Sequence, residues 1–270
     1  KIETILSNNL SVFIDLETTN VEYISKLVPY LPSLGISVVR IKMDQKGKTI
    51  YGGNRYISDT FNSAVNEFKL QLLSLLPFLE RYGVALAIEN HQDLHSYELL
   101  DISKSISEEL IGVTWDIGNS ISVVDTPNSF YNTAGHIIKN VHLKDYKIYK
   151  SKAGIRLVRC PLGDGYVDYL DVLKKLDVNN SIVNMSIELG AQVTRECDIN
   201  NRQYWDEFSD IPIDKGSFLD FVDQNAVDRD DSFSKFERGL TEEAMIESEL
   251  QDIEISVNNL KQLLLEMNYE

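Results

Sequence analysis

Short apolar, β-branched segments alternate with longer segments of helical periodicity as far as residue 188. This alternation is typical of βα units that build a parallel sheet with helices on its outside. The pattern predicts strands at residues 11–16, 37–43, 84–89, 111–116, 140–143 and 182–188. It predicts helices at residues 21–34, 59–82, 95–110 and 167–176. We therefore expect an α/β fold of the (β/α) barrel type.

Polar residues stand at the end of every predicted strand. The last four strands end, in order, in Glu89, Asp116, His142 and Glu188. The first two intervals between these residues are 27 and 26 residues, about one βα repeat each. The carboxyl ends of parallel strands meet at one edge of a barrel, where barrel active sites are built. We therefore expect the four side chains to converge on one mouth.

Three carboxylates and one imidazole form a hard, mixed oxygen and nitrogen ligand set. Such a set suits one divalent ion such as Mn²⁺, Mg²⁺, Co²⁺ or Zn²⁺ and does not suit soft copper. A carbonyl oxygen and the neighbouring hydroxyl of a sugar fit the ligand positions that remain open. The cation would then stabilise the enediolate that forms when the carbon between these two groups loses its proton. A carboxylate on either side of that carbon would remove and return the proton.

The charge balance limits the partners of the chain. With 26 Lys and Arg against 42 Asp and Glu, the formal net charge is −16, so nucleic acid and anionic lipid surfaces are disfavoured as partners. No apolar run approaches the ~18 to 20 residues of a membrane span. Two cysteines, Cys160 and Cys197, form neither a disulfide framework nor a paired zinc motif. We expect a cytoplasmic protein of 270 residues, a length that suits one large barrel or two ordinary domains.

The regular alternation stops after residue 188, and a more acidic, polar region follows. Four aromatic residues are candidate anchors that fold this region back onto the barrel: Trp205, Phe208, Phe218 and Phe221. A final helix over 241–268 carries an apolar stripe at the heptad spacing 4, 3, 4, 3, 4, 3, namely Ile246, Leu250, Ile253, Val257, Leu260, Leu264 and Met267. This helix either packs on its own barrel or pairs with a partner helix in a homo-oligomer. We expect a catalytic barrel over 1–205 and an acidic extension over 206–270.

Five short motifs carry a resemblance to a known family. They are 87–91 (AIENH), 115–119 (WDIGN), 140–145 (NVHLKD), 161–165 (PLGDG) and 186–190 (SIELG). In this order they resemble the successive motifs of the xylose isomerase-like barrel superfamily. That group includes sugar-phosphate isomerases and epimerases, ketose 3-epimerases and inosose dehydratases. The resemblance covers about residues 11 to 205.

The resemblance implies roles for individual residues. The metal ligands would be Glu89, Asp116, His142 and Glu188, with Glu89 and Glu188 also acting as the proton-transfer pair. The positions that match substrate-facing residues are His91, Asn119 and Lys144. A lysine beside a metal can also steady an enolate oxygen.

Near the fourth motif, the turn at residues 163–165 has two interpretations. It is either a simple turn or a contact for a substrate phosphate or hydroxyl in which Arg159 takes part.

The sequence departs from the family in two places. Ketose 3-epimerases usually have His where this chain has Asn119. Complete members have two further βα units before the strand at 11–16, so we expect the first two units to be missing and residues to precede Lys1. We therefore expect the six strands to keep barrel curvature with a gap between the first and the last.

These features predict a metal-dependent isomerase or epimerase that acts on a small carbohydrate. A dehydratase is the nearest alternative, because the same enolate beside a β-hydroxyl expels water. A barrel that binds without turnover is a further alternative. An abasic-site endonuclease of the same fold needs many histidine ligands for zinc, and four His in the whole chain cannot supply them.

Overall fold

Six parallel strands form the main sheet of the computed structural model, which describes residues 12–45, 50–178, 183–189, 193–227 and 232–267. The sheet order is β1-β2-β3-β4-β5-β8. The strands are β1 (Ile14–Leu16), β2 (Val38–Ile41), β3 (Ala85–Glu89), β4 (Ile111–Asp116), β5 (Ile138–Leu143) and β8 (Asn184–Ile187). Each coincides with a predicted strand, although residues 11 and 182 of the predicted ranges lie outside the described residues.

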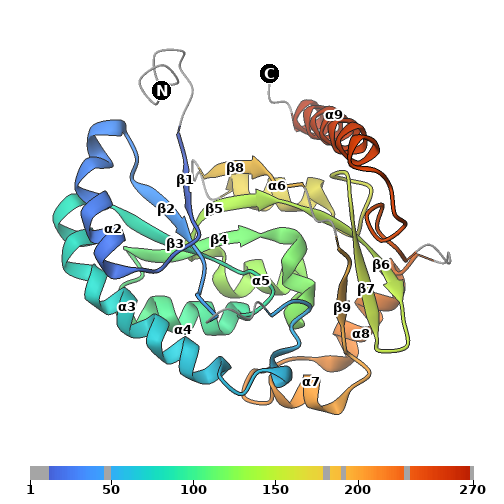
Figure 1. The fold of residues 1–270 in the computed structure, drawn as a ribbon, viewed down its shortest axis with the longest axis horizontal. Helices are drawn as coiled ribbons and strands as arrows, with labels where there is room; N and C mark the ends of the chain where they lie inside the picture. The colour runs from blue at the N-terminus through green and yellow to red at the C-terminus, as the bar shows by residue number, and fades with distance from the viewer. Residues whose placement is uncertain (1–11, 46–49, 179–182, 190–192, 228–231, 268–270) are drawn as a thin grey trace.

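The sheet curves as a half-barrel, with β1 and β8 as its two edges (Figure 1). All five neighbouring pairs of strands are parallel, and no pairing joins β1 to β8 among the described residues. Since parallel strands leave their carboxyl ends at the same edge, all six strand ends line one mouth. The structure thus confirms the barrel-type fold and the expected gap between the first and last strands.

The helices that follow the strands cover the outer face of the sheet (Figure 1). They are α2 (Val21–Leu27), α3 (Phe61–Tyr82), α4 (Ser96–Ile106), α5 (Pro127–Ala134) and α6 (Tyr169–Val178). In α3 the buried residues recur every three or four positions, namely Phe61, Ala64, Phe68, Leu72, Leu75 and Leu79. This spacing places them on one helix face, which packs against the sheet. Gly83 ends α3 in the left-handed region with φ +62°, where glycine has no steric cost, and β3 begins two residues later.

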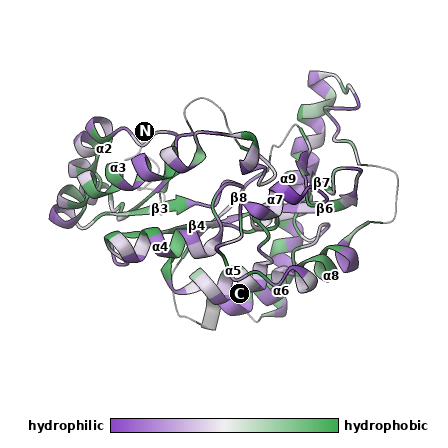
Figure 2. Ribbon diagram, turned by 90° about the horizontal axis from the view of Figure 1, so that it is seen from below, coloured by the Kyte–Doolittle hydropathy of each residue, from purple (hydrophilic) through white to green (hydrophobic). Residues whose placement is uncertain are grey.

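The central strands are buried on both faces. Every residue of β3 and β4 is buried, and both strands are rich in apolar residues. Figure 2 shows these hydrophobic strands beside helices of mixed hydropathy. Such burial is typical of a parallel sheet whose faces are both covered. The polar residues at the ends of these strands, Glu89 and Asp116, are buried as well.

A second sheet lies beside the mouth and was not predicted. It consists of the antiparallel strands β6 (Asp145–Lys150), β7 (Ile155–Cys160) and β9 (Arg195–Cys197), in that order. Directly opposed residues share a face, so Tyr146, Arg159 and Arg195 belong to one face of this sheet. That face is turned to the barrel, because the Tyr146 hydroxyl lies 3.3 Å from Asn119 Oδ1.

The region after β9 packs on the barrel through its aromatic residues, as expected. It contains α7 (Arg202–Asp206), α8 (Lys215–Asn225) and α9 (Glu242–Glu266). Phe208 and Phe218 are buried, and Trp205 and Phe221 pack against the same hydrophobic core. Among the described helices, none combines the length and the apolar character that a membrane crossing requires.

Helix α9 contacts the rest of the chain through both polar and apolar groups. The Ser256 hydroxyl accepts a hydrogen bond from the Leu162 amide at 3.1 Å, and Asn259 donates one to the Leu162 carbonyl at 2.7 Å. In the heptad stripe, Leu260 packs against the core, whereas Leu250 in the first half of the helix is 62% exposed. Packing of α9 against the barrel of the same chain therefore accounts for only part of the apolar stripe.

Candidate metal centre

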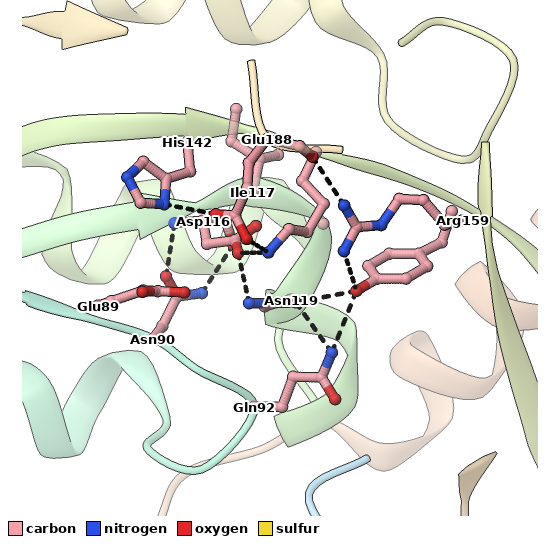
Figure 3. Close-up of polar contacts among 12 residues, drawn as sticks. Glu89, Asn90, Gln92, Asp116, Ile117, Asn119, His142, Arg159 and Glu188 are labelled. Carbon is pink, nitrogen blue, oxygen red and sulfur yellow. Dashed lines mark hydrogen bonds and ion pairs between the residues drawn. The ribbon is translucent and has the colours of Figure 1, made fainter. Parts of the chain in front are cut away.

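Four strand ends bring together the residues that the sequence singles out. Glu89 ends β3, Asp116 ends β4, His142 lies near the end of β5 and Glu188 follows β8. Asp116 and His142 are direct register partners, and the Glu188 amide donates to the Leu143 carbonyl at 3.0 Å. One ligand atom from each of the four residues lies within 4.8 Å of the others. Figure 3 shows the four side chains around a common point.

Each of the four residues has one buried polar atom without a hydrogen-bond partner. These atoms are Glu89 Oε1, Asp116 Oδ1, His142 Nδ1 and Glu188 Oε2. Two of them, His142 Nδ1 and Glu188 Oε2, lie 2.7 Å apart without the alignment of a hydrogen bond. Buried polar atoms are rarely left without partners, since desolvation then costs about 1–3 kcal/mol each. Four such atoms around one point match the ligand shell of a cation.

The other oxygen of each carboxylate is held by a neighbouring donor. Arg40 Nη2 contacts Glu89 Oε2, and Lys144 Nζ contacts Asp116 Oδ2. Lys144 Nζ also lies 2.8 Å from Glu188 Oε1. These donors leave the second oxygen of each carboxylate without a hydrogen bond. They orient the three carboxylates in the way that outer-shell partners orient metal ligands.

The cations also set the protonation of the acids. Burial raises the pKa of Glu188, but the contacts with His142 and Lys144 outweigh burial and hold that pKa well below its ordinary value. Burial lowers the pKa of Lys144, but the charges of Asp116, Tyr146 and Glu188 together outweigh burial and leave that pKa raised. Lys144 is therefore an ammonium group and Glu188 a carboxylate at neutral pH. Burial raises the pKa of Asp116, against the opposing charge of Lys144.

The donor set fits a hard divalent cation. It consists of three carboxylate oxygens and one imidazole nitrogen, which suit Mg²⁺, Mn²⁺, Co²⁺ or Zn²⁺. A bound cation would give each free atom the partner that it lacks. The residues present therefore fit the expected metal, and the candidate cluster consists of the four residues at the predicted strand ends.

Residues next to the ligands clamp the backbone of the site, and the sequence did not point to them. Asn90 donates to the Asp116 carbonyl at 2.9 Å and accepts from the Asp116 amide at 2.7 Å. Gln92 has φ +65°, an uncommon value for a residue with a side chain, and donates to Asn119 Oδ1 at 2.9 Å. Both residues join the end of β3 to the segment that follows β4. Their residue types alone gave no signal of this role.

The predicted substrate-facing residues lie around the four ligands. Asn119 is buried, and both of its amide atoms are engaged, since it donates to Asp116 Oδ2 and accepts from Gln92. His91 is half-buried against Tyr51, with ring centroids 5.8 Å apart. Burial, reinforced by Lys42, lowers the pKa of His91 to about 3, so its ring is neutral at physiological pH.

Arg159 also reaches this centre. It donates to the Glu188 carbonyl at 2.7 Å and to the Tyr146 hydroxyl at 3.2 Å. The structure thus places the four predicted substrate-facing positions, His91, Asn119, Lys144 and Arg159, beside the ligand set.

The turn at residues 163–165 is held by Asp145. The Gly163 and Gly165 amides each donate to Asp145 Oδ2 at 3.0 Å. The other oxygen of Asp145 accepts from the Tyr146 and Val167 amides at 2.9 and 3.2 Å. The glycine amides are therefore engaged within the chain, which favours the simple turn, and a substrate contact through Arg159 stays a prediction.

A family model places the chain among known barrels. The model described as the xylose isomerase-like TIM barrel matches residues 10–207. A curated relative, the 3-oxo-isoapionate decarboxylase of Pectobacterium atrosepticum, is 25% identical over 141 residues, which cover 50% of this chain and 51% of the relative. The match thus spans about half of that relative's own length.

Solved structures share the fold at low sequence identity. A D-tagatose 3-epimerase-like protein superimposes with a TM-score of 0.53 at 18% identity, over 83% of this chain and 82% of that one. A barrel protein from Mycobacterium smegmatis, solved in complex with magnesium, superimposes with a TM-score of 0.55 at 16% identity, over 82% of this chain and 76% of that one. At such identities the similarity shows a common fold.

Proposed function

Because this chain belongs to the xylose isomerase-like TIM barrel family, we propose that it is a divalent-metal-dependent isomerase or epimerase. Its substrate class would be a small sugar, sugar phosphate or keto-polyol. The observation that carries the proposal is the cluster of Glu89, Asp116, His142 and Glu188, in which one ligand atom from each residue lies within 4.8 Å of the others and each residue has a buried polar atom without a hydrogen bond. The magnesium complex of a structural neighbour supports the same view.

A bound divalent ion would supply Lewis-acid stabilisation of the negative charge that develops on the oxygens of a hydroxyketone. The proton transfers are proposed for Glu89 and Glu188. These residues come from β3 and β8, which β4 and β5 separate in the sheet, so they approach a substrate from different sides. One carboxylate would remove the proton beside the carbonyl, and the same or the other carboxylate would return it.

Lys144 is proposed to position this pair and to steady the substrate oxygen. Its ammonium group joins Asp116 to Glu188 and keeps Glu188 ionised, which is the state that a general base needs. A lysine is a compact point charge with three donors, so one further hydrogen bond remains for a substrate oxygen. Lys144 is therefore assigned both to the catalytic and to the substrate-binding set.

A metal-dependent lyase is the second candidate, and the decarboxylase named among the relatives favours it. Loss of water or carbon dioxide passes through the same kind of enolate as isomerisation. The two reactions differ in the group that leaves the neighbouring carbon. A barrel that only binds carbohydrate is the remaining alternative.

Proton exchange with solvent separates these functions. The protein would be incubated with Mg²⁺ or Mn²⁺ in D₂O and a panel of ketoses, ketose phosphates and keto acids, and the products followed by NMR. An isomerase or epimerase incorporates deuterium beside the carbonyl and conserves the carbon skeleton and oxygen count. A lyase gives a product that has lost water or carbon dioxide. Metal-dependent ligand binding without exchange or product would contradict both enzymatic proposals.

A further inference from the structure

Two arginines lie on the face of the second sheet that is turned to the metal centre. Leu157 of β7 is the register partner of Arg195 of β9, and Arg159 is two residues further along β7. Arg159 and Arg195 are therefore diagonal neighbours on one face, a relation that places side chains about 7–8 Å apart at their base. Long side chains at that separation can reach a common ligand.

Neither arginine forms an ion pair with a carboxylate among the described residues. Arg159 donates only to the neutral oxygens of Glu188 (its carbonyl) and Tyr146, and Arg195 lies over the Tyr51 ring at 3.7 Å. By contrast, Arg156 on the opposite face of β7 pairs with Glu237 at 2.8 Å.

This lack of acidic partners is unusual for the composition. Asp and Glu outnumber Lys and Arg by 42 to 26 in the sequence. The chain therefore has enough acidic residues to pair every arginine. Withdrawing a guanidinium from water is costly unless an anion compensates it. Because both arginines lack an acidic partner among the described residues, they resemble a site prepared for an anion from outside the protein.

The loop that carries Tyr51 connects Arg195 to the metal centre. Tyr51 lies between Arg195 and His91, and His91 is two residues from Glu89. Gly53 holds this loop against the barrel, because a Cβ there would meet the Ser122 carbonyl oxygen at 1.8 Å. On the other side, Arg159 contacts the backbone of Glu188 directly. Arg159 therefore contacts one of the four candidate ligand residues directly, and Arg195 is linked to the segment after Glu89 through Tyr51 and His91.

We propose that Arg159 and Arg195 form an anion subsite that binds the carboxylate or phosphate group of an acidic carbohydrate. That the ligand is a carbohydrate rests on the proposed function. The two arginines narrow the substrate class to carbohydrates that carry an anionic group. The planar guanidinium presents paired donors that match the oxygens of carboxylate and phosphate. The ketose end of the same molecule would face the four metal ligands.

Anion binding to the metal-free protein tests the subsite separately from the metal centre. Titration calorimetry at low salt would use inorganic phosphate and acetate as probes, so the two arms distinguish a phosphate site from a carboxylate site. We expect one of the two to bind, and Arg195→Met to weaken that binding at least tenfold. Arg202→Met is the matched control, because the Arg202 side chain is 92% exposed on α7. Binding of neither probe, or equal binding by the wild type and Arg195→Met, would refute the subsite.

Matched ketoses then test the preference in the metal-loaded protein. D-Fructose, D-fructose 6-phosphate and D-fructuronate share one ketose end and differ only in the group at C6. We expect an anionic member to bind at least tenfold more tightly than D-fructose, with the advantage lost in Arg159→Met and Arg195→Met. If all three bind alike, the proposal is wrong while the metal centre stands. If the metal does not bind but the probes do, the proposed function fails and the subsite stands.

Discussion

The ammonium group of Lys144 lies 2.8 Å from Glu188 Oε1, and His142 lies against the other oxygen of the same carboxylate. The two oxygens of Glu188 therefore have different tasks. One is fixed by a permanent charge, and the other faces the ligand cluster. The same division holds at Glu89, where Arg40 fixes one oxygen. Each of these carboxylates is oriented before a cation or a substrate arrives.

Replacing Lys144 by Met is expected to lower turnover by about 10²-fold or more, the usual scale of proton-transfer catalysis. Lys144 helps to hold the pKa of Glu188 down, so its removal leaves burial to raise that pKa. Because a base must be deprotonated, the acidic limb of the kcat/KM profile should move to higher pH. The profile of Lys150→Met should not move, since Lys150 is a 63% exposed surface residue. An unshifted acidic limb in Lys144→Met would contradict this role.

Glu188→Gln keeps the shape and one oxygen of the side chain but removes the base. We expect turnover to fall by about 10²-fold or more while metal affinity falls modestly. Solvent-deuterium incorporation into substrate, followed by NMR, measures the loss directly. Glu22→Gln on the exposed start of α2 serves as the control. Deuterium incorporation by Glu188→Gln at the wild-type rate would exclude Glu188 as the residue that transfers the proton.

Arg40→Met is expected to destabilise the metal-free protein by about 3–5 kcal/mol, because it leaves the fully buried Glu89 carboxylate without its partner. Metal affinity should fall about 10- to 100-fold, the usual effect of losing an outer-shell partner. Chemical denaturation and metal titration measure the two effects. Glu17→Gln removes the exposed partner of the same arginine and should cost less than about 1 kcal/mol. Equal effects of the two variants would show that Arg40 does not act through Glu89.

The exposed half of the α9 stripe predicts self-association. Ile246, Leu250 and Ile253 are 53%, 62% and 44% exposed at heptad positions. Glu247 and Lys261 flank the stripe at opposite ends of the helix, so an antiparallel pair of helices from two copies brings opposite charges together. Light scattering should show a dimer for the wild type and a monomer for Leu250→Glu, with Gln262→Glu as the control. A wild-type monomer at micromolar concentration would contradict the pairing.

The main sheet was predictable because its signal is local. Short apolar, β-branched runs marked all six strands, three- and four-residue periodicity marked four of the helices, and the heptad stripe marked α9. The range 111–116 agrees at both ends. The second sheet carried a similar signal, since Tyr146 and Ile148 alternate with more polar residues in β6. It was missed because β6 follows β5 after only Lys144, so two strands with different partners read as one polar segment.

The four ligands were predictable for a different reason, namely the regular geometry of parallel strands. Their partners were not, because an ion pair such as Arg40 with Glu89 joins residues 49 positions apart. A charged residue inside the buried strand β2 was the one available signal for Arg40. For Arg195, only the register of β7 and β9 reveals which face it occupies. Sequence patterns predict which residues share a face of a helix or strand and where a strand ends. Contacts between residues far apart in the sequence become visible only in the folded structure.

One divalent cation is expected to bind at the four strand ends. The most direct measurement is the anomalous difference density of a crystal of the protein grown with Mn²⁺. We predict one strong peak within about 2.0–2.3 Å of Glu89 Oε1, Asp116 Oδ1, His142 Nδ1 and Glu188 Oε2, in the range of metal–ligand bonds. A peak bound by other residues, or no peak among these four at millimolar Mn²⁺, would contradict the account.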